Sequence, residues 1–263
     1  MKILNSTPVF KKEATPEIAG ELLDCARAAK TACMAIEGAR HEMDTERAVG
    51  ELAREAGMLA EFDPARMLTD RNVALAFWIN LYNTLVIHGA LHFRIRRSIT
   101  EIRGFFRRVA YLIGGHIYTL DIIEHGFLRE NRGHPIRIFV PQLMPWDRRR
   151  RLVIRPMDTR VHFALNCGAT SCPPIRHYTA DKLDAELNLA VRAFLAGGGV
   201  AIDPQTGGVL LSRIFLWYAR DFGWTRRRQL ESILHYLDES TRRDFVSAAA
   251  RGIRYLDYDW SLG

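Results

Sequence analysis

The most apolar stretch of the chain, residues 73–93, carries hydrophobic side chains on nearly every face of a helix. Thr69 or Asp70 could cap its first turn, because either side chain accepts hydrogen bonds from free helix amides. A helix that is apolar all round belongs in the middle of a fold. Its length would also suit a membrane span, but the polar side chains within it make insertion into lipid costly. We therefore predict a central buried helix.

A polar stripe runs along this predicted helix. Asn80, Thr84 and His88 recur every four residues and so share one face, with Asn83 beside them. Buried amides and imidazoles need hydrogen-bond partners. The stripe therefore either faces a polar site or holds neighbouring backbone in place, and the pattern leaves both possibilities open.

Residues 14–62 show apolar side chains at helical spacing, which predicts two or three helices with a break at residues 37–46. Cys25 and Cys33 lie eight residues apart on this pattern, so they can share a face. A free cysteine behaves there as a small apolar residue. We expect both cysteines to be core residues.

Two similar units follow, and each is typical of a hairpin that leads into a short helix. Strand-like runs in residues 108–120 surround a Gly-Gly turn and precede a helical pattern over residues 121–130. Residues 199–212 repeat this arrangement before a helical pattern over residues 213–223. The two hairpins should supply most of the strands of the fold.

The segment between the two units alternates in polarity. Every second side chain in residues 161–165 is apolar, which predicts a strand. Gly168 would end this strand just after Cys167. Residues 179–198 then predict an amphipathic helix with Thr179 as its cap and a glycine stop.

Together these elements predict an α+β fold. A helical N-terminal region would occupy residues 1–64, and a small, mostly antiparallel sheet would pack on the central buried helix within residues 65–263. No linker rich in Pro, Gly or Ser separates the two parts. We expect them to form one compact unit.

Composition agrees with a folded domain, since 48% of the residues are hydrophobic and 25% are charged. The four cysteines are too few for the disulfide framework of a small secreted protein, so we expect reduced thiols. The first residues hold no apolar run long enough for a signal peptide, which favours a cytoplasmic location.

The net charge is +7, and arginine strongly outnumbers lysine. Clusters of arginine could bind an anionic partner, such as a nucleic acid or a membrane surface, or could be solvated loop and helix ends. No specific nucleic-acid-binding motif accompanies them. No glycine motif for a nucleotide or flavin stands at a strand-to-helix junction, so we predict no cofactor.

Residues 162–177 concentrate the candidate chemistry. They place His162, Cys167, Cys172 and His177 at equal five-residue intervals. Tetrahedral zinc would suit these ligand types, although the even spacing matches no familiar zinc knuckle. A transient disulfide between the cysteines and plain packing around a turn are further interpretations.

A cysteine nucleophile is the remaining interpretation. Free amides in the loop after Cys167 could lower the pKa of its thiol and stabilise an oxyanion. The general base would be His125 or His162, oriented by Glu124 or Asp221. On a regular strand His162 and Cys167 would lie on opposite faces, which favours His125.

Five phrases of the sequence, taken together and in order, resemble the domain of unknown function 547 family. They are AFWINLYNTLVIHG (76–89), LDIIEHGFLR (120–129), RVHFALNCGATSCPPI (160–175), IFLWYARDFG (214–223) and YDWSLG (258–263). The resemblance covers about residues 65–263. The final residue is Gly263 where the family commonly has Asn, and a secretion signal that many bacterial members carry is not seen.

The family is distantly similar to the papain-like and transglutaminase-like cysteine enzymes, a fold-level analogy. This similarity implies a cysteine nucleophile that transfers acyl groups at an amide or ester. Papain-like nucleophiles begin a long buried helix, whereas the long helix here carries Asn and no Cys. The resemblance thus implies rearranged catalytic parts or a lost nucleophile.

The leading hypothesis is a cysteine-dependent hydrolase or acyltransferase that acts on a small molecule or peptide. Substrate contacts are expected from polar and aromatic side chains and one glycine in the matching motifs: Asn80, Asn83, His88, Asn166, Gly168, Tyr258, Asp259 and Trp260. The alternative is a non-catalytic binding or scaffolding module in which the same residues form a buried polar network.

Overall fold

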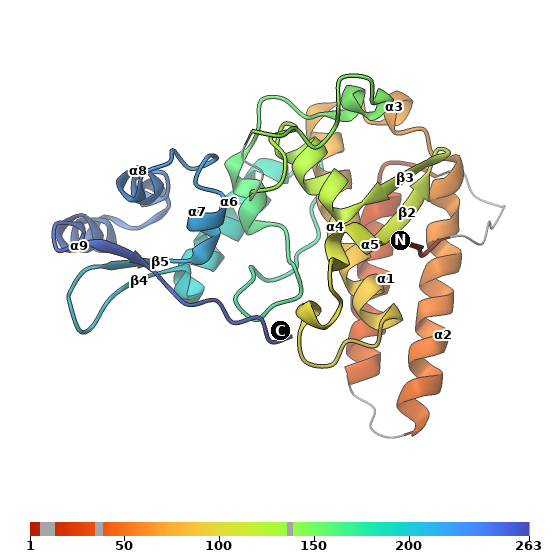
Figure 1. Cartoon of the computed structure of the whole chain (residues 1–263), viewed down its shortest axis with the longest axis horizontal. Coiled ribbons are helices and arrows are strands. Elements are labelled where there is room, and N and C mark those ends of the chain that lie inside the picture. Colours follow the sequence, from red (N-terminus) through yellow and green to blue (C-terminus); the bar gives the residue numbers. More distant parts are fainter. Residues whose placement is uncertain (6–13, 35–38, 136–138, 263) are drawn as a thin grey trace.

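The computed structural model of the protein describes residues 1–5, 14–34, 39–135 and 139–262. Within these ranges the chain is an α+β protein, as the sequence predicts. The elements gather in two lobes, and the carboxyl-terminal segment returns to the middle of the molecule (Figure 1). Each lobe has its own hydrophobic core.

The first lobe is built around helix α4 (Arg71–His92), which confirms the predicted central helix. The carboxylate of Asp70 accepts hydrogen bonds from the amides of Asn72 and Val73 at 2.8 and 3.0 Å, so Asp70 is the cap. Helices α1 (Ile18–Met34) and α2 (Ala39–Glu55) pack on α4. By length and composition α4 could cross a membrane, but 89% of its most apolar window is buried inside the protein.

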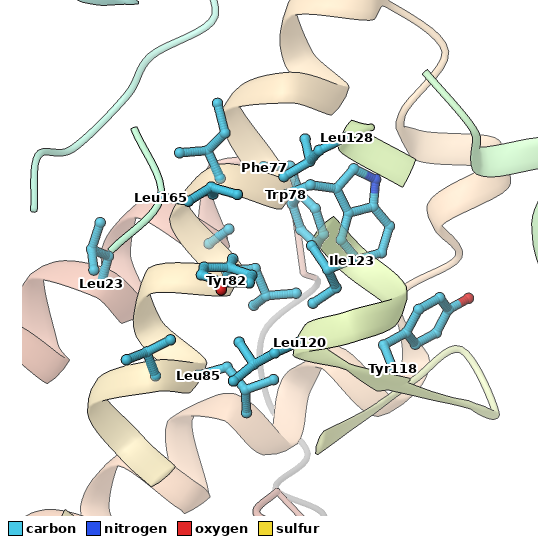
Figure 2. Close-up of a cluster of buried hydrophobic side chains, with 14 of the residues drawn as sticks. Leu23, Phe77, Trp78, Tyr82, Leu85, Tyr118, Leu120, Ile123, Leu128 and Leu165 are labelled. Carbon is cyan, nitrogen blue, oxygen red and sulfur yellow. The ribbon is translucent and has the colours of Figure 1, made fainter. Parts of the chain in front are cut away.

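Short helices and a three-stranded sheet complete this lobe. The helices are η1 (Ala56–Glu61), α3 (Pro64–Met67), η2 (Ile99–Glu101), α5 (Phe105–Arg108), η3 (Ile122–Leu128) and η4 (Arg148–Leu152). The strands are β1 (Lys2–Ile3), β2 (Val109–Ile113) and β3 (His116–Thr119). Figure 2 shows side chains from α4, β3 and η3 interlocked in the core, with Tyr82 among them.

The second lobe holds the remaining helices and a second small sheet. Its helices are α6 (Leu183–Phe194), η6 (Leu195–Gly199), α7 (Arg213–Trp217), α8 (Arg226–Glu231), η7 (Leu234–Tyr236) and α9 (Glu239–Ala249). Its strands are β4 (Val200–Ile202), β5 (Val209–Leu211) and β6 (Ile253–Tyr255). Its core is rich in phenylalanine from η5 (Thr159–Phe163), α6 and α7.

Both predicted hairpins are confirmed, but they lie in two sheets where the sequence predicts one. Each hairpin gains its third strand by parallel pairing with a distant segment: β1 pairs with β2, and β6 with β5. Both sheets are therefore mixed rather than mostly antiparallel. Strands of two or three residues leave no alternating pattern long enough to detect.

The predicted strand before Cys167 is wrong, because residues 159–163 form the 3-10 helix η5. The side chain of Asp158 caps this turn by accepting a hydrogen bond from the amide of Arg160 at 3.0 Å. Residues 161–165 are all buried, since the segment passes between the two cores. Its alternating polarity thus does not reflect one buried and one exposed face.

Three smaller predictions are also wrong. Helix α2 begins at Ala39, so most of the predicted break at 37–46 is helical. Cys25 is exposed at the edge of the buried stripe of α1, while the side chain of Cys33 lies outside the described residues. Thr179 does not cap α6; its amide and hydroxyl donate to the carboxylate of Glu186 at 2.7 and 3.0 Å.

Candidate functional site

A cluster of buried charged side chains joins the two lobes. Glu124 and His125 lie on η3, Arg129 follows directly, His162 lies on η5 and Asp221 follows α7. Arg129 Nε donates to Asp221 Oδ2 at 2.6 Å, and His162 Nε2 lies 2.9 Å from the same oxygen. The side chains of Arg129 and Asp221 are 2% and 0% exposed. We call these five residues the charged cluster.

Helix η3 positions its part of the charged cluster as a π-helix, in which the amide of Arg129 donates to the carbonyl of Glu124 at 2.8 Å. The two carboxylate oxygens of Glu124 accept from the hydroxyls of Tyr82 at 2.9 Å and Tyr218 at 2.5 Å. His125 Nδ1 lies 3.0 Å from Arg129 Nη1. Every ionisable group of the charged cluster therefore has a polar partner.

The charged cluster holds neutral imidazoles and ionised carboxylates near pH 7. Burial lowers the pKa of His125 to about 4 and also lowers the pKa of His162. Burial alone would raise the pKa of Asp221, but hydrogen bonds from His162 and Arg129 hold it well below its usual range. Hydrogen bonding and the charge of Arg129 likewise offset burial for Glu124, whose pKa is lowered.

A second polar cluster contains the sulfur atoms. Cys167 Sγ and Cys172 Sγ are free, half-buried thiols that lie 2.6 Å apart. The hydroxyl of Tyr258 lies 3.0 Å from Cys172 Sγ and 3.3 Å from Cys167 Sγ. The amide of Cys167 donates to Cys172 Sγ at 3.0 Å. We call these three residues the thiol cluster.

Within the thiol cluster, the negative charge belongs on Cys172. Burial would raise the pKa of Cys172, but hydrogen bonds from the thiol and amide of Cys167 and from Tyr258 lower it below the usual thiol range. The hydrogen bond to Cys172, together with burial, raises the pKa of Cys167 well above that range. These directions, together with the amide of Cys167 that donates to Cys172 Sγ, favour Cys172 as the sulfur that ionises first.

The loop before the thiols is held by Asn83 of α4. Asn83 Nδ2 donates to the carbonyl of Ala164 at 3.0 Å, and Asn83 Oδ1 accepts from the amide of Asn166 at 2.9 Å. These are the two hydrogen bonds that a neighbouring strand would supply. Asn166 Oδ1 then accepts from the amide of Gly168, whose φ of +91° suits glycine. One buried side chain thus fixes the approach to Cys167.

The carboxyl-terminal segment closes over the other side of this loop. The amide of Thr170 donates to the carbonyl of Ser261 at 2.7 Å, and the amide of Asp259 donates to Ser171 Oγ at 2.8 Å. These hydrogen bonds place Tyr258 against the sulfur atoms. The predicted residues Asn166, Gly168, Tyr258, Asp259 and Trp260 therefore do gather around the thiols.

Three aromatic rings extend the thiol cluster outward. The ring centroids of Trp217 and Tyr258 lie 4.7 Å apart, and those of Tyr258 and Trp260 also lie 4.7 Å apart. Trp217 and Trp260 complete the triangle at 5.5 Å. Trp260 is 36% exposed, so an aromatic surface leads from solvent to the hydroxyl that contacts the sulfurs.

The rest of the polar stripe on α4 holds neighbouring groups in place. The side-chain amide of Asn80 pairs with the amide and carbonyl of Tyr178 at 3.0 and 2.8 Å. His88 Nδ1 lies 2.8 Å from the hydroxyl of Tyr111. Both Asn80 and His88 are buried. The sequence allows a stripe that faces a polar site or one that holds neighbouring backbone in place. The contacts of Asn80 and His88 agree with the second.

The four residues at five-residue intervals do not form one site. His162 bonds to Asp221, and His177 Nδ1 lies 3.0 Å from Asp24 on α1. Only Cys167 and Cys172 contact each other among the four. Over the residues that the structure describes, no group of three or more His, Cys, Asp or Glu side chains could hold a metal ion.

The sequence predicts that His125 or His162 contacts the thiol of Cys167. No such contact is among the hydrogen bonds of the described residues. The hydroxyls of Tyr82 and Tyr218 donate instead to Glu124 of the charged cluster. Burial and the charge of Glu124 raise the pKa of both hydroxyls. Sequence reasoning did not single out these tyrosines or Arg129. The one available signal for Arg129 is its position four residues after His125 on the same helix.

Comparison with known families identifies part of the chain. Residues 66–195 match the family model described as "Protein of unknown function, DUF547". The chain therefore contains a DUF547 domain over this range, which includes both thiols, His125 and His162 but neither Asp221 nor Tyr258. No curated protein and no solved structure matches the chain. No support for a likeness to papain-like or transglutaminase-like enzymes comes from these matches.

Proposed function

We propose that the protein carries out thiol–disulfide exchange through Cys172 and Cys167. The observation that supports this function is the surroundings of Cys172 Sγ: it accepts from the amide of Cys167, and it lies 2.6 Å from Cys167 Sγ and 3.0 Å from the hydroxyl of Tyr258. A thiolate is the nucleophile in this chemistry, and an adjacent second thiol completes the reaction.

The reaction needs only these two thiols and a disulfide substrate. The Cys172 thiolate attacks one sulfur of the substrate, which forms a mixed disulfide and releases the other half as a thiolate. Cys167 then loses its proton and attacks Cys172 Sγ, which releases the second half of the substrate. Two electrons pass from the protein to the substrate, and Cys167 and Cys172 end as a disulfide. One released half takes up the proton that Cys167 loses, and the other takes up a proton from solvent.

Exchange suits the site better than acyl transfer because of the leaving group. A thiolate leaves a disulfide without a proton, since its own pKa is near 8.5. An amide nitrogen leaves only when a positioned acid protonates it. In the described residues neither sulfur has a histidine within hydrogen-bond distance, while His125 and His162 are engaged in the charged cluster.

A second candidate is the cysteine-dependent acyl transfer that the sequence predicts, with Cys167 as its nucleophile. It is supported by the residue types that the chain offers, a half-buried thiol together with the buried Glu124 and His125. A general base would have to come within reach of Cys167 when the substrate binds.

The experiment that separates these functions follows each cysteine by mass spectrometry. We expect Cys172 to be alkylated with an apparent pKa below the usual value of about 8.5, and the exposed Cys25 serves as the internal control. With an aromatic disulfide, Cys167→Ser should trap a mixed disulfide on Cys172, and Cys172→Ser should not react at that site.

Other outcomes overturn the proposal in favour of a named alternative. Accumulation of an acyl group on Cys167 from an activated ester, with no reaction toward disulfides, would establish acyl transfer. Thiols that react only when the protein unfolds would establish a non-catalytic binding or scaffolding module.

A further inference from the structure

A cleft of about 100 Å³ opens between the loop after η3 and the segment that follows α7. A cavity needs roughly 10–15 Å³ to hold one water molecule. The cleft therefore has room for several waters, or for a carboxylate and its nearest carbon. Its polar and aromatic lining residues are Arg129, Arg132, His134, Trp217, Arg220 and Trp224.

We infer that this cleft binds a carboxylate group of the disulfide substrate, so the identity of the ligand rests on the proposed function. Three arginines, Arg129, Arg132 and Arg220, line the cleft, and none of its described lining residues is acidic. The guanidinium of Arg129 is held by Asp221 and by the carbonyl of Gly133, so Arg132 and Arg220 are the arginines offered to the ligand. The planar fork of arginine matches a carboxylate with two parallel hydrogen bonds. Trp217 and Trp224 offer apolar surface for the attached carbons.

The surrounding carboxylates limit the charge of the ligand. Arg132 pairs with Asp221 at 3.0 Å and with Glu130 at 3.6 Å, and Arg129 pairs with Asp221. Glu124 adds a further negative charge near Arg129. Because these groups offset part of the guanidinium charge, the cleft favours a singly charged carboxylate over a doubly charged phosphate.

The backbone around the cleft is held in unusual conformations. Of the described non-glycine residues, four have positive φ, and three of these border the cleft: Glu130 at +53°, Asn131 at +60° and Trp224 at +67°. The side chain of Asn131 fixes its loop by pairing with the amide and carbonyl of Leu143 at 2.7 and 3.0 Å. Such conformations persist where the surrounding structure enforces them, commonly at binding sites.

Trp217 connects the cleft with the thiols. It lines the cleft, and its ring meets that of Tyr258 edge-on with centroids 4.7 Å apart. The hydroxyl of Tyr258 contacts both sulfur atoms. A molecule whose carboxylate lies in the cleft can therefore extend across Trp217 toward Cys172. The substrate class that fits is a small disulfide whose thiol half carries a carboxylate.

Two disulfide probes test this inference. We expect Arg132→Gln and Arg220→Gln to slow the reaction with the dicarboxylate 5,5′-dithiobis(2-nitrobenzoate) about tenfold, and to leave the reaction with neutral 2,2′-dipyridyl disulfide unchanged. Arg227→Gln is the matched control, since Arg227 is exposed and pairs with Glu231 on α8. Equal slowing with both probes would overturn the inference.

A second measurement separates this inference from the proposed function. Tryptophan fluorescence of the Cys167→Ser/Cys172→Ser protein, titrated with acetate and with inorganic phosphate, reports binding near Trp217 and Trp224 without any thiol chemistry. A saturable change with acetate that Arg132→Gln abolishes supports a carboxylate site even where disulfide exchange fails. No response to acetate, or tighter binding of phosphate, contradicts it.

Discussion

The charged cluster and the thiol cluster differ in how they surround their polar groups. Every ionised group of the charged cluster meets an opposite charge or several donors and is almost completely buried. In the thiol cluster, Cys172 is half-buried and its sulfur contacts only the amide and sulfur of Cys167 and the hydroxyl of Tyr258.

This difference follows from the cost of burying charge. A charge that leaves water must be compensated by partners. A nucleophile must also keep a free lone pair and a route to solvent. The buried, paired groups of the charged cluster therefore suit a structural role, and the half-buried sulfurs suit the exchange chemistry that we propose.

The largest expected effect comes from breaking the charged cluster. Arg129→Met should lower the free energy of unfolding by about 3–5 kcal/mol, because it leaves Asp221 buried without its main cation. Arg227→Met, which breaks an exposed ion pair with Glu231, should cost less than about 1 kcal/mol. Urea unfolding measures both. A loss below about 1 kcal/mol for Arg129→Met would show that the charged cluster does not stabilise the fold.

Acid should weaken the charged cluster. The pKa of His125 is about 4 in the folded protein and near 6.5 when unfolded, so this group's stabilisation is complete above pH 6.5 and is lost as pH falls toward 4. The loss for His125 alone is about 2–3 kcal/mol at pH 4.5. His88 and His162, whose pKa values are also lowered by burial, act in the same direction.

The measurement is urea unfolding of the wild type and His125→Gln between pH 7.5 and 4.5. The variant should show a shallower decline, since its side chain does not take up a proton. Equal slopes in the two proteins would mean that His125 is not buried in its neutral form.

The two buried asparagines of α4 provide a matched pair. Asn83→Ala and Asn80→Ala should each cost about 1–3 kcal/mol, because each leaves a backbone amide and carbonyl without their partner. Only Asn83→Ala should change the alkylation rates of Cys167 and Cys172, since Asn83 alone holds the loop before them. Similar alkylation rates in both variants would contradict the role given to Asn83.

The smallest effect is expected at the thiol cluster itself. Tyr258→Phe removes a donor from the sulfurs and should raise the apparent pKa of the Cys172 thiol by about one pH unit, with little change in stability. Tyr255→Phe is the control, because the hydroxyl of Tyr255 donates to Gln229 in the second lobe. The pH dependence of alkylation gives the answer, and an unchanged pKa would exclude Tyr258 as a donor to the thiolate.

The sequence predicts correctly those elements in which the order of apolar and polar side chains follows which faces are buried. Helix α4 is buried on all sides and is apolar on all sides, and each hairpin has its glycine-containing turn. Residues 159–165 pass between two cores, so polarity there follows neither strand nor helix periodicity. Strands β1 and β6 depend on pairing with distant segments, which local pattern does not record.

The sequence indicates which polar residues belong to the candidate site, but not which of them contact each other. Glu124, His125, His162 and Asp221 were singled out together, and they do meet in the charged cluster. The sequence pattern points these residues toward the Cys167 thiol, because it does not single out Arg129. In the structure the guanidinium of Arg129 contacts both Asp221 and His125 instead. A contact between residues 92 positions apart has no signature in a single sequence.

The hydrogen bonds between the thiol loop and the carboxyl-terminal segment also set an order of assembly. Cys172 leaves the ribosome 86 residues before Tyr258, the side chain that donates to its sulfur. During that interval Cys172 lacks this contact, so its thiol keeps the pKa of an unfolded chain, about 8.5. The surroundings of Cys172 are therefore completed only after the second lobe has been synthesised.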